Sequence, residues 1–125
     1  ALSFSGKSSP TIQYAYTRMH SLLNKVEINK INYNNIVVTN QKERNLVKTL
    51  LQYGRILNIS YNKLEPHHLA NYLYKLTCVF NSWYGEVKIL KDDKNLNSRL
   101  YIIKKTQKVI KEGLELLGID TLERM

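Results

Sequence analysis

The 125-residue sequence contains a single cysteine, Cys78. No disulfide can form within the chain, and a zinc site built from cysteine thiolates is excluded. No apolar run approaches the ~20 residues of a membrane span, and residues 1–10 lack the apolar core of a signal peptide. We therefore expect an intracellular protein that does not enter the membrane. Because the chain begins with Ala1 rather than Met, we also expect it to be a piece of a longer protein.

The sequence also lacks a recognisable arrangement of catalytic residues. The sequence shows no acid–base pair and no nucleophile beside a base. His67 and His68 are neighbours, and neighbouring side chains on a helix diverge by about 100°. We therefore expect neither a metal site nor a catalytic residue. Cys78 has no histidine at helical spacing to activate it, which predicts a buried, inert thiol.

Positive charge is abundant: 19 Lys and Arg against 10 Asp and Glu give a net charge of +9. Such a surface attracts polyanions, of which nucleic acid is the commonest and anionic membrane the second. Blocks of like charge are absent, so this is not a disordered basic tail. Lys104, Lys108 and Lys111 stand at i, i+4 and i+7 and form one cationic stripe on a helix. Contact with phosphates and a merely solvated helix face are equally good interpretations of that stripe.

Aromatic side chains are also numerous, with nine Tyr, one Trp and two Phe. Rings interleaved with Lys and Arg are typical of single-stranded RNA recognition, in which unstacked bases lie on the rings and cations hold the phosphates. Tyrosine is equally an ordinary core residue of helical bundles. For any single tyrosine, packing in the core is the stronger interpretation.

Hydrophobic residues recur at three- and four-residue steps in four segments, near residues 10–27, 40–57, 64–84 and 96–117. Each segment is long enough for a helix with one buried face. Convincing strands with period-two alternation are absent. We therefore predict an all-α fold, a bundle of about four main helices.

The expected helix ends carry recognisable signals. Ser9 suits the cap of the first helix, with Pro10 in its first turn. Asn40 and Glu43 are spaced like a capping box at the start of the second helix, and Gly54 is expected to interrupt or kink it. Gly118 is well placed to follow the end of the last helix.

Residues 1–8 resemble a loose phosphate-binding loop that ends in Gly6-Lys7-Ser8. Such a loop lies between a strand and a helix. Here no strand precedes it, and Pro10 follows closely. A nucleotide-binding fragment therefore remains only a rival hypothesis.

Three segments carry a more specific signal. Residues 6–18 read GKSSPTIQYAYTR, residues 64–84 begin LEPHHLANYLYKL and end FNSWY, and residues 113–125 read GLELLGIDTLERM. In this order they resemble the anticodon-binding domain of arginyl-tRNA synthetases, and together they cover nearly the whole chain. Ser9 and Thr11 stand where the family usually has Gly and Tyr. Trp83 and Leu122 replace the usual Phe or Tyr and the usual Pro.

The resemblance implies that residues 1–125 are one domain, the C-terminal, DALR-type anticodon-binding domain of a class I synthetase. The catalytic domain is absent from this chain. The implied partners are tRNA(Arg) and the catalytic domain of the same polypeptide, in the cytoplasm or, alternatively, in an organelle. The domain itself would hold no cofactor and no metal. ATP and magnesium would belong to the full-length arginine–tRNA ligase.

Matching positions imply a set of anticodon-loop contacts: Tyr14, Arg18, Asn81, Trp83, Tyr84 and Met125. Candidates for contact with the RNA backbone are Lys7, Lys104, Lys108 and Lys111. Thr11 removes one ring from the expected RNA-facing set. The alternative hypothesis is a helical protein-interaction module whose Tyr and Leu faces dock a partner and whose basic surface is incidental.

Overall fold

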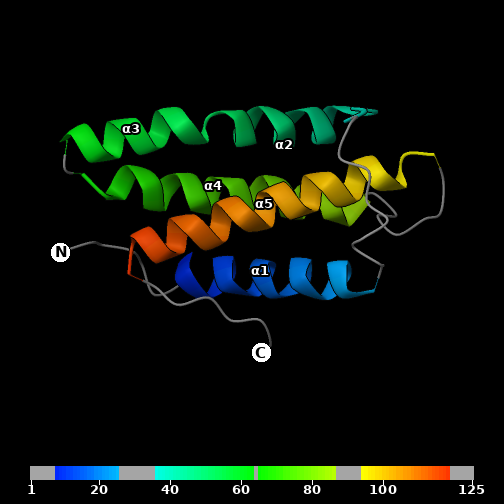
Figure 1. The fold of residues 1–125 in the computed structure, drawn as a ribbon, viewed down its shortest axis with the longest axis horizontal. Coiled ribbons are helices and arrows are strands. Elements are labelled where there is room, and N and C mark those ends of the chain that lie inside the picture. Colours follow the sequence, from blue (N-terminus) through cyan, green and yellow to red (C-terminus); the bar gives the residue numbers. More distant parts are fainter. Residues whose placement is uncertain (1–7, 26–35, 64, 87–93, 119–125) are drawn as a thin grey trace.

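The computed structural model describes residues 8–25, 36–63, 65–86 and 94–118, apart from the side chains of Ser8 and Glu86. Five helices make up most of these ranges: α1 (Ser8–Asn24), α2 (Gln41–Leu51), α3 (Tyr53–Lys63), α4 (His67–Glu86) and α5 (Leu96–Leu116). No strand occurs within the described ranges. Because α2 and α3 follow one another end to end, the chain forms four rods (Figure 1). The predicted all-α bundle is confirmed.

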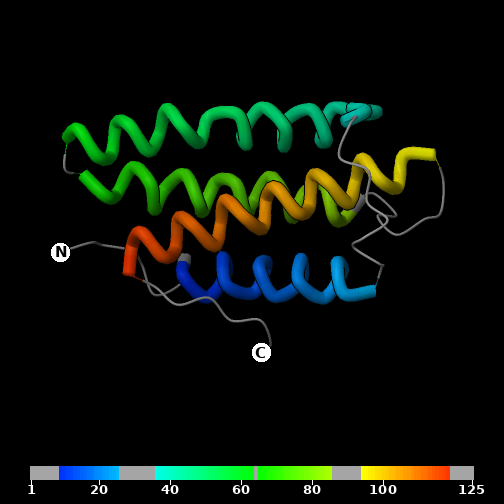
Figure 2. Tube along the Cα trace, in the orientation of Figure 1, coloured from blue at the N-terminus to red at the C-terminus, as the bar shows by residue number. Residues whose placement is uncertain are grey.

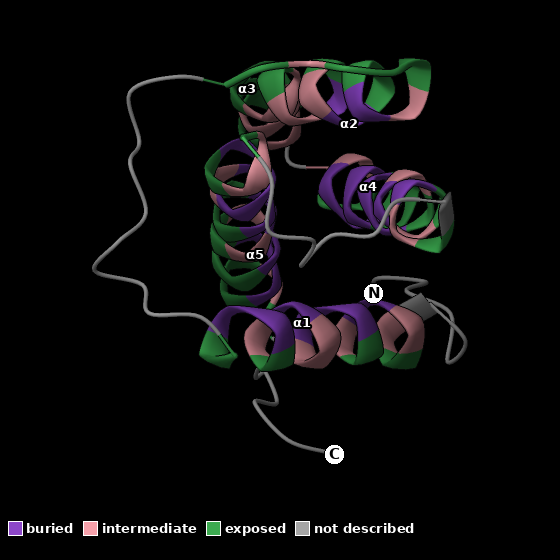
Figure 3. Ribbon diagram, turned by 90° about the vertical axis from the view of Figure 1, so that its right-hand side faces the viewer, coloured by how far each residue is buried: buried purple, intermediate pink, exposed green. Residues whose placement is uncertain are grey.

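The helices form a bundle in which α4 and α5 lie between α1 on one side and the α2–α3 rod on the other (Figures 1 and 2). Helix α4 packs against all the other helices, and α1 packs against α4 and α5. The buried residues of α1, α2, α4 and α5 face the middle of the bundle (Figure 3). A single apolar core therefore fixes the relative positions of α1 and α4, which carry the candidate site.

The core follows the predicted periodicity closely. Large, fully buried side chains come from α1, α2, α4 and α5: Ile12, Met19, Leu46, Leu73, Leu76, Phe80, Trp83, Ile102, Ile103, Ile110 and Leu114. Burying an aliphatic or aromatic side chain contributes about 1.5–3 kcal/mol relative to leaving it exposed. Helix α3 buries no residue fully. The α2–α3 rod is therefore anchored mainly through α2.

The start of α2 is fixed by the predicted capping box. The Asn40 side chain accepts a hydrogen bond from the Glu43 N–H at 2.9 Å. In return, the side-chain Nδ2 of Asn40 donates to Glu43 Oε2 at 3.2 Å. The Trp83 indole N–H reaches the same oxygen from α4 at 3.3 Å. One buried carboxylate thus joins the start of α2 to the C-terminal half of α4.

The other helix ends agree with the predictions in part. Gly118 has φ = 78° and follows the end of α5, as predicted. The interruption of the second predicted helix falls at Gln52, two residues before Gly54. Helix α1 begins at Ser8, so Pro10 lies in its first turn, but Ser9 is already helical and is not the cap. This corrects the assignment of Ser9.

Two further findings concern the surface. Cys78 is exposed, which contradicts the predicted buried thiol. Leu76 and Phe80 face the core. Cys78 is two residues from each of them, and two residues turn a helix by about 200°, so the Cys78 side chain points away from the core. Within the described ranges, no helix has the length and apolar character needed to cross a membrane.

Gly113 lies where α5 approaches α4 closely. A Cβ added at Gly113 would lie only 2.7 Å and 2.8 Å from the two methyl carbons of Leu73, which is fully buried. We expect Gly113→Ala to lower the free energy of unfolding by up to about 2 kcal/mol. The reason is that overpacking a core costs ~1–3 kcal/mol and the gain in helix propensity is only about 1 kcal/mol. Urea denaturation followed by circular dichroism measures the change.

Gly54→Ala is the matched control, because no atom lies within 4 Å of a Cβ added at Gly54 in α3. That variant is expected to be as stable as the parent or up to about 1 kcal/mol more stable. If both substitutions stabilised the domain equally, the close approach at Gly113 would not constrain the bundle.

Candidate nucleic-acid interface

The candidate site is centred on Arg18, at the contact between α1 and α4. The guanidinium carbon of Arg18 lies 5.0 Å from the centre of the Tyr14 ring and 4.6 Å from the centre of the Tyr84 ring. Its Nη1 donates a hydrogen bond to Asn81 Oδ1 at 3.4 Å. Cation–π contacts of this kind contribute about 0.5–1 kcal/mol each at exposed positions. We call Tyr14, Arg18, Asn81 and Tyr84 the Arg18 cluster.

Helical geometry explains why the cluster forms. Tyr14 and Arg18 are four residues apart on α1, and Asn81 and Tyr84 are three apart on α4, so each pair shares one helix face. The Tyr84 ring stacks on Phe80, with ring centres 6.0 Å apart and planes 30° apart. Since Phe80 is fully buried, the core holds Tyr84 in place from below.

The cluster offers groups that suit an unpaired nucleotide. The Tyr14 side chain is 54% exposed, so its ring has surface free for stacking. Arginine is charged at all working pH values and presents several N–H donors. Flat rings bind bases, and a guanidinium binds phosphates or stacks on bases. No group in the cluster is arranged for covalent chemistry, so its chemistry is that of binding.

Trp83 does not lie at the surface, where a residue that contacts the anticodon would have to lie. Its side chain is 0% exposed and packs edge-on against Phe80, with ring centres 5.9 Å apart. The indole N–H is already bonded to Glu43. A ring without exposed surface offers nothing to an RNA base. The structure therefore corrects the expected role: Trp83 is a core residue beneath the cluster.

The remaining predicted residues fall into two groups. Lys7 and Met125 lie outside the described residues. Lys104, Lys108 and Lys111 are exposed on α5, and the first two line a small hollow of about 140 Å³ together with Tyr101 and Lys105. This lysine stripe is on a different helix from the Arg18 cluster. Thr11 is partly buried on α1, one turn before Tyr14.

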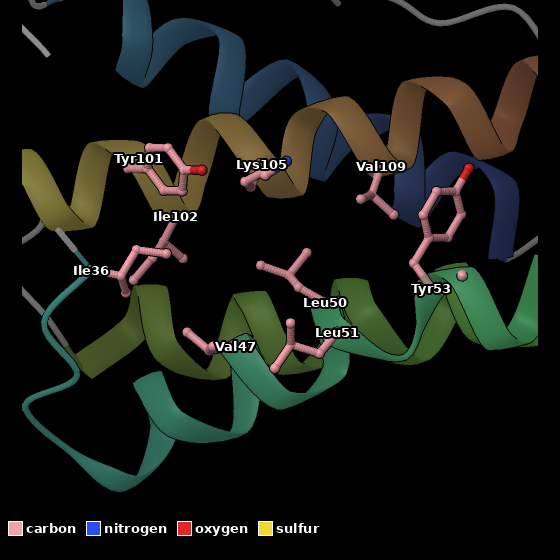
Figure 4. Close-up of a pocket in the computed structure, with 10 residues that line it drawn as sticks. Ile36, Val47, Leu50, Leu51, Tyr53, Tyr101, Ile102, Lys105 and Val109 are labelled. Carbon is pink, nitrogen blue, oxygen red and sulfur yellow. The ribbon is translucent and has the colours of Figure 1, made fainter. Parts of the chain in front are cut away.

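An apolar hollow of about 420 Å³ lies between the α2–α3 rod and α5, away from the α1–α4 contact (Figure 4). Val47, Leu50, Ile102 and Val109 line it, and Lys105 reaches its edge. Leu51 at its margin is 79% exposed. Apart from Lys105, Tyr53 and Tyr101 the lining is apolar, so the hollow suits apolar contact rather than catalysis.

A comparison with known protein families identifies the family of this chain. Residues 12–125 match the model of the family described as "DALR anticodon binding domain". The chain belongs to the DALR anticodon-binding domain family. The predicted DALR-type anticodon-binding domain is thereby confirmed.

Individual relatives of this DALR domain are arginine–tRNA ligases. The chain is 41% identical to the enzyme from Pasteurella multocida over 128 residues, covering 99% of the chain and 23% of that enzyme. It is 42% identical to the enzyme from Mannheimia succiniciproducens, covering 22% of it. The chain thus spans less than a quarter of the length of these relatives.

The fold of the DALR domain also matches solved structures. The Thermus thermophilus arginyl-tRNA synthetase matches with a TM-score of 0.83 and 29% identity, over 98% of this chain and 22% of that one. The synthetase from Plasmodium falciparum matches with a TM-score of 0.82, also at 29% identity, over 99% of this chain and 22% of that one. Helical domains of arginyl-tRNA synthetases therefore share this arrangement of helices.

Proposed function

We propose that this domain binds the anticodon loop of tRNA(Arg) and so positions the tRNA for ATP-dependent aminoacylation by a catalytic domain of the same polypeptide. The observation that carries the proposal is the Arg18 cluster, in which one guanidinium lies against two tyrosine rings on two helices. Family membership supports it independently. ATP and magnesium act at the catalytic domain, and the cytoplasm is the proposed place of action.

Within this proposal, Tyr14 and Tyr84 offer ring faces to unstacked anticodon bases, and Arg18 holds the two rings in place. Base–ring stacking contributes about 1–3 kcal/mol per base. Asn81 fixes the Arg18 guanidinium by accepting its hydrogen bond. Met125 and Lys7 remain proposed contacts by matching position.

The exposed lysines of α5 supply the proposed backbone contacts. Lys104, Lys108 and Lys111 face away from the core, and a phosphate neutralised by each would release counterions from the RNA. These contacts would raise affinity without reading the anticodon sequence, because phosphates are the same at every position.

A titration of the chain with labelled tRNA(Arg) tests the proposal. Fluorescence anisotropy is expected to show binding that weakens as salt rises from about 50 to about 200 mM, with a linear fall of log K against log salt. A tRNA of equal length with a scrambled anticodon loop should bind less tightly. Equal binding of both RNAs, or an affinity that does not change with salt, would contradict anticodon recognition.

A second candidate function is supported by the apolar hollow between the α2–α3 rod and α5. A helical protein-interaction module would dock a partner there and would show no affinity for tRNA at low salt. The same anisotropy titration separates this alternative from the main proposal.

A further inference from the structure

Three side chains with metal-binding atoms converge at the start of α4. Glu65, His67 and His68 each offer one ligand atom, and these atoms all lie within 4.8 Å of one another. His68 Nε2 is 2.7 Å from Glu65 Oε2, and His67 Nε2 is 3.8 Å from the same oxygen. The two imidazole rings have centres 4.2 Å apart. The expected divergence of the two histidines is therefore not observed.

The backbone before α4 explains the convergence. His67 is the first residue of α4, so Glu65 lies in the turn that precedes it. The Glu65 N–H donates to the Ser60 carbonyl at 3.1 Å, and the His68 N–H donates to the Glu65 carbonyl at 3.2 Å. Pro66 restricts the backbone between them. The turn brings Glu65 over the first helical turn, and both histidines reach it.

One carboxylate oxygen and two imidazole nitrogens are a donor set that suits Zn²⁺. Catalytic zinc sites use two histidines and one glutamate, with water at the open position. With metal–ligand distances of about 2.0–2.2 Å in tetrahedral geometry, neighbouring ligand atoms lie roughly 3.3–3.5 Å apart. The distances of 2.7 Å and 3.8 Å bracket that separation.

We propose that Glu65, His67 and His68 bind one Zn²⁺, with water completing the coordination. Two features weaken the site relative to a closed four-ligand zinc site. The N-terminus of α4 carries a partial positive charge, and all three side chains are at least partly exposed. The bound ion would tie the turn that carries Glu65 to the first turn of α4.

Isothermal titration of the tag-free chain with ZnCl₂ tests the proposal. The titration uses a Cys78→Ser background, because the exposed Cys78 thiol could bind zinc by itself. We expect one Zn²⁺ per chain. His67→Ala and His68→Ala are each expected to weaken binding at least tenfold, about the smallest loss seen when even an outer-shell partner is removed.

His20→Ala is the matched control, because it removes the only other histidine, which lies on α1. It should leave zinc binding unchanged, whereas Glu65→Gln should weaken it as the histidine variants do. Circular dichroism of each variant establishes that the bundle is intact. The proposal is overturned if the His67→Ala/His68→Ala double variant binds zinc as tightly as its parent, or if the parent shows no stoichiometric binding.

Discussion

Arg18→Ala is expected to weaken binding of tRNA(Arg) by about ten- to a hundredfold. The substitution removes the cation that touches both Tyr14 and Tyr84, and it leaves the two rings without the group between them. A lost charge toward the RNA and weaker stacking on two rings that Arg18 no longer orders account for a loss of this size, because stacking contributes about 1–3 kcal/mol per base. Fluorescence anisotropy at low salt measures it.

Two further variants test whether the loss of affinity comes from the Arg18 position or only from the lower net charge. Arg44→Ala removes the same charge from an exposed position on α2, and it should change affinity far less. Arg18→Lys keeps the charge but loses the planar guanidinium, so it should lie between the parent and Arg18→Ala. If Arg44→Ala and Arg18→Ala had equal effects, only net charge would matter, and the Arg18 cluster would not be the binding site.

Trp83→Ala is expected to lower the free energy of unfolding by about 3–5 kcal/mol, the usual range for removing a large buried aromatic side chain. Trp83 is fully buried and packs against Phe80. The substitution also removes one of three hydrogen bonds to Glu43 Oε2, which keeps those from Thr39 and Asn40, so the lost bond costs a further ~0.5–1.5 kcal/mol. Urea denaturation followed by circular dichroism measures the loss.

Trp83→Phe makes a smaller change at the same position. It keeps a large aromatic ring but loses the indole N–H and part of the buried ring volume, so a smaller loss of about 1–3 kcal/mol is expected. Tyr74→Ala, at a 42% exposed position on the same helix, should change stability least of the three. A Trp83→Ala variant as stable as Tyr74→Ala would contradict the core position of Trp83.

Much of the fold could be predicted because it depends on short-range patterns. The spacing of apolar residues places Leu73, Leu76 and Phe80 on one helix face, and the structure buries all three. The Asn40–Glu43 capping box is likewise a local signal, complete within four residues. Such signals need no knowledge of which helix lies beside which.

The candidate site could be predicted only in part. A family motif transfers positions along the chain, but not the directions in which side chains point. Trp83 and Tyr84 are neighbours in one motif, yet helical geometry turns one into the core and leaves the other at the Arg18 cluster. Likewise, the contact between Arg18 and Asn81 depends on the register of α1 against α4, which periodicity within a single helix does not specify.

Two predictions were wrong for reasons that the helix itself supplies. Cys78 was expected in the core because free cysteines are commonly buried, yet its spacing from Leu76 and Phe80 places it on the opposite face. His67 and His68 were expected to diverge as helical neighbours do. That rule fails at the first residue of a helix, where a preceding turn can bring a third side chain to both rings.

The contact between α1 and α4 also affects the order in which the domain gains its binding surface. Arg18 and Asn81 are 63 positions apart in the chain. Helix α1 packs on α4 and α5, both distant in sequence, whereas α2, α3 and α4 are near neighbours along the chain. Closing a long loop costs entropy that is repaid only after the distant segments meet. Folding intermediates that hold only α2, α3 and α4 would therefore be helical but would lack half of the Arg18 cluster.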